Sequence, residues 1–289
     1  MAEISASAVM ELRKMSGQGM MDCKKALGET AGDVEAAMEL LRKKGLATLA
    51  KRAGRETSEG LVVTQASDDG KTVALVSLCC ETDFVAKSEG FVAVAETLGN
   101  YAIACEDDEG AGAVLETEID GTKFSKVLTD AVSQTGEKTE VGDYAKFQLD
   151  GTGLISTYIH FNKKIGTMVQ VDTSDDSVAG SDVLRQAAND IAMHITATKP
   201  MSLDESGIDA KTVEHEKAIF AEQMKGKPEN IIGKIVEGKM KKFFAENCLL
   251  AQPFVKDDSK TVGQFIADAG KQAGGEAKVV RFVCFSVGE

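Results

Sequence analysis

The residues best suited to act on another molecule form one short run, Thr82-Asp83-Phe84-Val85. In this run a carboxylate stands directly before a large apolar ring. The run follows a strand-like segment, Thr72 to Leu78, and precedes a helix-like segment that begins near Phe91. Turns between strands and helices often present side chains that act on other molecules. A ring favours burial, and a carboxylate favours water, a metal or a donor, so one partner molecule that takes up both would satisfy them together.

Other residues suited to catalysis or metal binding are dispersed. The histidines His160, His194 and His215 lack metal-ligand spacing, and the apolar helix around His194 predicts a half-buried structural role for it. The adjacent Cys79 and Cys80 are interpreted as strand residues rather than a redox pair, since strand neighbours point to opposite faces. The sequence has no phosphate-binding glycine loop and no defensible nucleophile–histidine arrangement. We therefore predict a protein that is not an enzyme and that holds no metal and no cofactor.

Composition narrows the function classes further. The chain has 289 residues, a net charge of −13 and a pI of about 4.9, so its field repels phosphate backbones and disfavours direct nucleic-acid binding. The short basic run Lys239, Lys241 and Lys242 is interpreted as a solvated helix face. No segment has the length of a membrane span, and the start lacks a secretory signal. The six scattered cysteines suit reduced thiols, so we expect a cytoplasmic protein without a membrane partner.

The first 45 residues predict a small module of three helices. We place Ser7 as the cap of the first helix and Asp33 as the cap of the third, which Gly45 ends. Met20-Met21 opens the second helix after a glycine-rich break. Core is the default interpretation of these two methionines, with an adaptable surface as the alternative.

An internal repeat organises the rest of the chain. Gly153-Leu154-Ile155 stands 93 positions after Gly60-Leu61-Val62, and the strand-like and helix-like segments that follow keep this offset without a gap. The repeat predicts two related α+β subdomains with antiparallel sheets. Where the first unit has Phe84, the second has Ser177. The architecture of the unit therefore does not demand the ring, which favours a functional role for it.

These patterns set the predicted domain limits. The predicted units are a helical module at 1–45, a linker at 46–59 that is either helical or flexible, a first core subdomain at 60–150, a second at 151–210 and 247–289, and a helical hairpin insertion at 211–246. Gly226-Lys227-Pro228 is the predicted hinge of the hairpin. Residues 105–120 predict a solvated acidic loop, and residues 278–287 predict a strand that completes the second sheet.

A series of short runs also carries a resemblance to a known family. The runs are Gly17 to Leu27, Thr82 to Lys87, Ile191 to Ile195, Gly226 to Pro228, Glu237 to Phe243, Gln252 to Val255 and Lys260 to Gln264. In this order they are similar to the bacterial-type elongation factor Ts family over nearly the whole chain. Each run is short, but their number and order together are specific.

The resemblance implies a translation elongation factor that acts as a guanine-nucleotide exchange factor. Such a protein binds elongation factor Tu·GDP, disturbs its Mg²⁺ site and promotes GDP release so that GTP can bind. The resemblance also implies an N-terminal module like ubiquitin-associated domains, two related core subdomains and a coiled-coil hairpin. Compatible assemblies are a homodimer and a heterotetramer with elongation factor Tu. Many members carry a helical tail beyond the last strand, and we expect any contact made by that tail to be missing here.

Residue roles follow from the same resemblance. The run Thr82-Asp83-Phe84-Val85 matches the motif that dislocates the magnesium ion of the partner. Arg13, Met20 and Met21 would contact the nucleotide-binding domain of the partner. His160 would touch the partner from the second subdomain.

Two other function classes stay open on the residues alone. One is an acidic α+β enzyme or ligand-binding protein that uses the cleft between the subdomains, with Asp83 as an acid. It predicts small-molecule binding and no effect on a GTPase. The other is a self-associating scaffold built on the hairpin 213–244. Deleting the hairpin would abolish the function of a scaffold, whereas the exchange role predicts only a partial loss.

Overall fold

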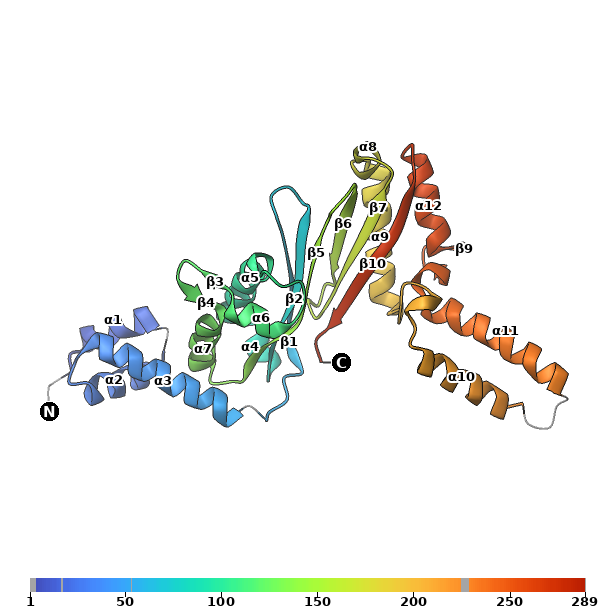
Figure 1. Ribbon diagram of the computed structural model, residues 1–289. Helices are drawn as coiled ribbons and strands as arrows, with labels where there is room; N and C mark the ends of the chain where they lie inside the picture. The colour runs from blue at the N-terminus through green and yellow to red at the C-terminus, as the bar shows by residue number, and fades with distance from the viewer. Residues whose placement is uncertain (1–3, 17, 53, 225–228, 289) are drawn as a thin grey trace.

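The computed structural model describes residues 4–16, 18–52, 54–224 and 229–288 of this chain. A three-helix module leads into a mixed core of sheets and helices, from which a helical hairpin projects (Figure 1). The module contains α1 (Ala6–Ser16), α2 (Met20–Glu29) and α3 (Val34–Arg52). Their apolar sides meet in a small core made of Val9, Leu12, Cys23, Ala26, Leu27, Ala37 and Leu41. The three predicted helices are confirmed, and the likeness to ubiquitin-associated domains stays a prediction.

The caps of these helices agree with the sequence in one case out of two. Asp33 caps α3 as predicted, because its Oδ1 accepts the N–H of Ala36 at 3.0 Å. The prediction for α1 is wrong by two residues. Ser5, not Ser7, is the cap, since the Oγ of Ser5 accepts the N–H of Ala8 at 3.2 Å.

The third helix is longer than predicted. Gly45 does not end it, because α3 continues to Arg52 and takes in the first part of the predicted linker. Gly45 lies where α3 packs on α7 (Phe124–Thr135), and a Cβ atom at this position would overlap the side chain of Ser133. A residue without a side chain therefore permits a close helix crossing here rather than a helix stop.

Two three-stranded antiparallel sheets form the middle of the core. The first contains β1 (Glu59–Ala66), β2 (Thr72–Cys80) and β5 (Thr139–Gln148) in the order β1-β2-β5, and the second contains β6 (Gly153–Ile159), β7 (Ile165–Thr173) and β10 (Ala277–Ser286) in the order β10-β7-β6. The alternation along β2 shows why both faces are covered. Val76 and Leu78 pack against helices, whereas Val73 and Leu75 pack against the second sheet. The strand predicted at the chain's end is confirmed as β10.

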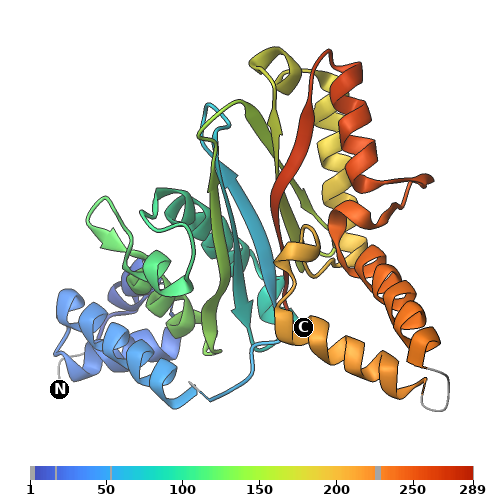
Figure 2. The ribbon, with the colours of Figure 1, turned by 45° about the vertical axis from the view of Figure 1, so that its right-hand side comes forward.

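Helices cover the outer faces of both sheets. The helices α5 (Glu89–Ala104) and α7 lie outside the first sheet, and α9 (Asp182–Thr198) and α12 (Val262–Gln272) lie outside the second (Figure 2). The core thus has four layers, helix, sheet, sheet and helix, which agrees with the predicted α+β class. The smaller elements are α6 (Ala111–Glu116), β3 (Glu118–Ile119), β4 (Thr122–Lys123), η1 (Glu205–Gly207), η2 (Leu249–Ala251), β8 (Pro253–Phe254) and β9 (Asp257–Thr261).

The internal repeat is visible in the element bounds. Strands β7 and β2 begin and end 93 positions apart, and so do the short helices α8 (Asp176–Ala179) and α4 (Asp83–Ala86). Phe84 and Ser177 therefore occupy equivalent places, as predicted.

The two repeat units run in opposite directions, which gives the core two equivalent ends. We call them the α4 end, formed by α4 and the β6–β7 turn (160–164), and the α8 end, formed by α8 and the β1–β2 turn (67–71) (Figure 1). At the α4 end, Lys164 pairs with Glu59 at 2.6 Å, and Glu59 lies opposite Cys80, the residue at which β2 leads toward α4. At the α8 end, residues 69–71 and residues of α8 line one cavity of about 360 Å³.

The hairpin consists of α10 (Ala210–Glu222) and α11 (Glu229–Asn247) (Figures 1 and 2). The predicted hinge, Gly226-Lys227-Pro228, lies outside the described residues. Lys241 and Lys242 pair along the helix with Glu237 and Glu246 at 3.0 Å and 3.6 Å. The interpretation of this basic run as a solvated helix face is therefore confirmed for Lys241 and Lys242. It is wrong for Lys239, which is half-buried, donates to Oε1 of Gln223 and lies 5.1 Å from the ring centroid of Phe220 on α10.

Some buried positions differ from their predictions. The segment 105–120 is not only a loop, because it contains α6 and buries Val114. His194 is fully buried rather than half-buried, and its Nε2 lies 2.8 Å from Oε1 of Gln252, so its role is structural.

All six cysteines are free, and each is buried or half-buried. Burial raises the pKa of the Cys80 thiol to about 12, as expected for a strand residue.

Candidate functional site

The predicted strand-to-helix turn is a single turn of helix, α4. Thr82 caps it in an extended conformation (φ −129°, ψ 153°), and its Oγ1 accepts the N–H of Val85 at 3.4 Å. One helical turn sends successive side chains in different directions. Ala86 is buried and Val85 packs on the core, whereas the Phe84 side chain is 83% exposed. The turn therefore uses its small and branched residues as a base and presents the ring to solvent.

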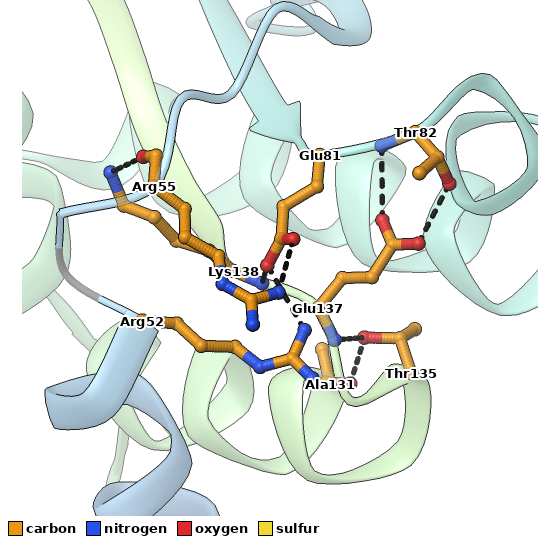
Figure 3. Close-up of polar contacts among 8 residues, drawn as sticks. All are labelled: Arg52, Arg55, Glu81, Thr82, Ala131, Thr135, Glu137 and Lys138. Carbon is orange, nitrogen blue, oxygen red and sulfur yellow. Dashed lines mark hydrogen bonds and ion pairs between the residues drawn. The ribbon is translucent and has the colours of Figure 1, made fainter.

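The cap residue is itself held from a neighbouring element. Glu137 lies between α7 and β5, and its carboxylate receives two hydrogen bonds from Thr82 (Figure 3). The N–H of Thr82 donates at 3.0 Å and its Oγ1 at 2.7 Å. Two hydrogen bonds to one carboxylate fix both the backbone and the side chain of the residue that caps α4.

Glu81, directly before the cap, gathers donors from three further segments. Its carboxylate lies 3.0 Å from Nη1 of Arg52, at the end of α3, and 2.7 Å from Nη1 of Arg55, in the segment that follows (Figure 3). The backbone N–H of Lys138 donates to it at 2.6 Å. The Glu81 side chain is 16% exposed, so this carboxylate connects the three-helix module to the base of the α4 turn.

The ionisation of Glu81 follows from these contacts. Desolvation raises its pKa, but the hydrogen bonds from Lys138, Arg55 and Arg52 outweigh that effect and lower the pKa to about 2. Glu81 and Glu137 received no role from the sequence, because their partners lie 26 to 57 positions away in the chain. The one available signal was an acid directly before the motif together with two arginines in the predicted linker.

Asp83 faces solvent beside its own helix. It pairs with Lys87 one turn later at 2.7 Å; the Lys87 side chain is exposed and the Asp83 side chain is about half exposed. The hydrogen bond from Lys87 holds the pKa of the Asp83 carboxyl below its usual value. Asp83 is therefore ionised at neutral pH, which is the opposite of what a general acid needs. This contact removes support from the alternative in which Asp83 is the acid of an enzyme.

The equivalent turn of the second unit has the same shape without the ring. Asp175 caps α8, and its Oδ1 accepts the N–H groups of Ser177 and Val178 at 2.9 Å and 3.1 Å. Val178 is buried, as the base of this turn. The second copy thus forms a stable helical turn with serine in the place of Phe84, so packing of the unit does not explain the aromatic residue.

The other predicted site residues belong to other elements than the motif. Arg13 is exposed on α1, and Met20 and Met21 are exposed at the start of α2. The default interpretation of the two methionines as core is therefore wrong, and the surface alternative holds. His160 lies in the β6–β7 turn at the α4 end. In Figure 1 the module stands at one side of the core, so only a partner as large as a protein could contact all of these residues together.

Metal sites and membrane-spanning helices were the other possibilities to consider. Across the part of the chain that the structure describes, no three His, Cys, Asp or Glu side chains gather in a way that could hold a metal ion. Within the same residues, no helix is both long and apolar enough to cross a membrane.

Comparisons with known proteins place the chain in a family. The family model described as elongation factor TS matches residues 81–289. Elongation factor Ts of a Nitratiruptor species is 44% identical over 288 residues, which cover 99% of this chain and 93% of that protein. Elongation factor Ts of Alkalilimnicola ehrlichii is 42% identical, with 99% and 92% covered, and that of Clostridium botulinum (strain Eklund 17B / Type B) is 43% identical, with 99% and 93% covered. The chain therefore belongs to the elongation factor Ts family, whose members are elongation factors of protein biosynthesis.

Proposed function

We propose that this protein is the guanine-nucleotide exchange factor of elongation factor Tu. It binds elongation factor Tu·GDP, disturbs the Mg²⁺ site of that GTPase and promotes release of GDP, so that GTP can bind. The observation that carries the proposal is the exposed Phe84 ring on a capped, externally tethered turn, together with its absence at the equivalent Ser177. Membership of the family supplies the partner.

The proposed mechanism acts on the metal through the shape of the partner. A GTPase holds GDP through Mg²⁺ and through backbone N–H groups around the phosphates. Phe84 enters the partner as a wedge, and burying such a ring contributes about 1.5–3 kcal/mol. The wedge moves the segments that hold the metal. Loss of Mg²⁺ removes positive charge beside the diphosphate, so the exchange factor and GDP weaken each other's binding reciprocally.

The hydrogen bonds that hold the α4 turn reduce the free energy lost when the ring binds. Thr82 and Glu81 are fixed before the partner arrives, so little binding energy is lost in ordering α4. Asp83, paired with Lys87, keeps a negative charge next to the ring and is placed to accept hydrogen bonds from the partner. Val85 packs against the core of the first subdomain and so holds the turn in place.

The remaining predicted contacts extend the same surface. Arg13, Met20 and Met21 contact the nucleotide-binding domain of the partner from the module, and His160 contacts the partner from the second subdomain. Exchange needs no catalytic group in this chain. The cytoplasm as location, the absence of direct nucleic-acid contact, and assembly as a homodimer or as a heterotetramer with elongation factor Tu belong to the same proposal.

Release of labelled GDP from elongation factor Tu, followed with and without this chain, tests the function. We expect strong acceleration by the intact protein and a loss of about 30-fold or more in the maximal rate for Phe84→Ala, the size typical of a central aromatic anchor. Ser177→Ala is the matched control and should leave the rate unchanged. No acceleration by the intact, folded chain would overturn the proposal.

A further inference from the structure

The repeat relates a second pair of surface positions, in the hairpin turns 67–71 and 160–164. Both turns close in the same way. The N–H of Gly70 donates to the carbonyl of Ser67 at 2.9 Å, and the N–H of Lys163 donates to that of His160 at 2.7 Å. Gly70 and Lys163 both have positive φ, of 69° and 57°. The two turns are therefore equivalent in conformation as well as in chain position.

A side-chain hydrogen bond repeats in the two turns as well. Oδ1 of Asp69 accepts the N–H of Lys71 at 3.0 Å, and Oδ1 of Asn162 accepts the N–H of Lys164 at 3.0 Å. The residue directly before each accepting side chain differs sharply between the two turns. The first turn places Asp68 at the position where the second turn places Phe161.

Phe161 is unusual for its place. Its side chain is 87% exposed, and its described ring contact is with the neighbouring His160, at 4.4 Å between ring centroids. Aspartate is a common turn residue, whereas an exposed phenyl ring gives a turn no conformational advantage. The turn closes equally well with Asp68, so the conformation of the turn does not account for Phe161.

Phe161 also lies at a particular end of the molecule. Within the described residues, Phe84 and Phe161 are the two most exposed large hydrophobic side chains. Both belong to the α4 end, because Lys164 pairs with Glu59 at 2.6 Å and the carbonyl of Lys163 accepts the N–H of Val62 at 2.7 Å. The α8 end carries Ser177 and Asp68 at the equivalent positions. One end of a nearly symmetric core is thus aromatic where the other is polar.

We infer that Phe161 is a second aromatic anchor, which inserts into an apolar pocket of the same GTPase that receives Phe84. The inference rests on the proposed function and extends its contact surface along the α4 end. The turn is well suited to hold an anchor, because its own hydrogen bonds and its link to Glu59 fix it before binding. The N–H of Val287 adds a further bond at 2.9 Å to the carbonyl of Lys164.

The two rings have different tasks. Phe84 stands on the turn that acts on the metal site, so it determines the maximal exchange rate. Phe161 stands on the other repeat unit and contributes to affinity alone. Truncating Phe161 should therefore change the concentration of exchange factor needed, whereas truncating Phe84 should change the rate at saturation.

The experiment measures GDP release from elongation factor Tu over a series of concentrations of Phe161→Ala, Phe84→Ala and Asp68→Ala. For Phe161→Ala we expect a rise of about tenfold or more in the half-saturating concentration, with a maximal rate within about twofold of the intact protein. Asp68→Ala, the matched control at the α8 end, should behave like the intact protein. Phe161→Leu should restore part of the affinity, because it restores part of the apolar surface.

Each outcome separates this inference from the proposed function. If the intact chain accelerates release and Phe161→Ala has the same half-saturating concentration as Asp68→Ala, the second anchor is wrong while the exchange function stands. A fall in the maximal rate alone would also overturn the assignment of Phe161 to affinity. If the intact chain has no effect, the proposed function itself fails. Circular dichroism and thermal unfolding confirm that the variants are folded, as expected for a ring that makes few contacts.

Discussion

The turns α4 and α8 have the same length and the same place in their units, yet they are held in different ways. The cap of α8 needs no other segment, because Asp175 accepts two backbone hydrogen bonds and a third from Oγ of Ser177 at 2.6 Å. The residue before this cap, Ser174, exchanges two hydrogen bonds with Glu276, between α12 and β10. Turn α4 has a longer cap bond, which the N–H of Val85 donates to Oγ1 of Thr82 at 3.4 Å. It also depends on Glu137, which accepts from Thr82, and on Glu81, which pairs with Arg52. The turn with the exposed ring is thus tied to the helical module and to the α7–β5 loop. The polar turn needs neither.

The largest expected effect comes from moving the ring between the two turns. In the double variant Phe84→Ala, Ser177→Phe, the ring stands at the α8 end, away from His160 and the module. We expect GDP release to stay about 30-fold or more below that of the intact protein, as for Phe84→Ala alone. Recovery to within a few-fold would mean that any exposed ring suffices and that the difference between the two ends has no functional meaning.

The tether at Glu81 gives the next effect. Glu81→Gln keeps the shape but weakens the bonds from Arg52, Arg55 and Lys138, and bonds to a charged group are worth about 1.5–3 kcal/mol. We expect a loss of about 1–3 kcal/mol in the free energy of unfolding, measured with urea, together with slower exchange. Ser174, at the equivalent place before α8, is the control, and Ser174→Ala should leave exchange unchanged. Unaltered exchange in a destabilised Glu81→Gln would show that the link to the module is only structural.

The pH dependence of stability sharpens the same point. The pKa of Glu81 is lowered to about 2 in the folded protein, below its ordinary value of 4.5. Its contribution is therefore fully present above the unfolded pKa and is lost as the pH falls from about 4.5 toward 2. Urea unfolding at pH values of about 7, 5 and 3 should show a smaller acid loss for Glu81→Gln than for the intact protein. Parallel curves for both proteins would contradict this role.

The smallest effect separates the two caps. Thr82→Val removes the cap bond and the hydroxyl bond to Glu137, and Asp175→Ala removes the cap of α8. Each should cost about 1 kcal/mol of stability. Only Thr82→Val should also slow GDP release, by a few-fold, because only α4 presents the wedge. Equal exchange rates for both variants would remove the functional distinction between the turns.

Much of the fold could be predicted because its information is local. The alternation of apolar residues in β2 and the helical spacing after Phe91 identified their elements. The ungapped repeat then predicted that these elements form two equivalent units. Gly45 was wrongly predicted to end its helix. A glycine is needed there because the side chain of Ser133, on another helix, leaves no room for a Cβ atom, and no local sequence pattern shows this contact. The short helix α6 was hidden in an acidic, glycine-rich segment that resembles a loop.

The candidate site could be predicted at positions where the residue type is unusual for the local structure. Phe84 was found because an aromatic residue beside an acid is out of place in a turn, and its repeat partner Ser177 supported that interpretation. The same comparison, applied to Phe161 and Asp68, would have identified the second ring. Glu81 and Glu137 were beyond reach, since an ordinary acid becomes a tether only when distant donors surround it.

The buried thiols have a practical consequence for labelling. Burial is the leading cause that raises the pKa of Cys79, Cys80 and Cys248, and thiols in the protonated form react slowly with maleimides. A cysteine introduced by Asp68→Cys would lie on an exposed turn and react first. A fluorophore there would sit at the α8 end, away from both aromatic rings, and would follow complex formation without blocking the contact surface.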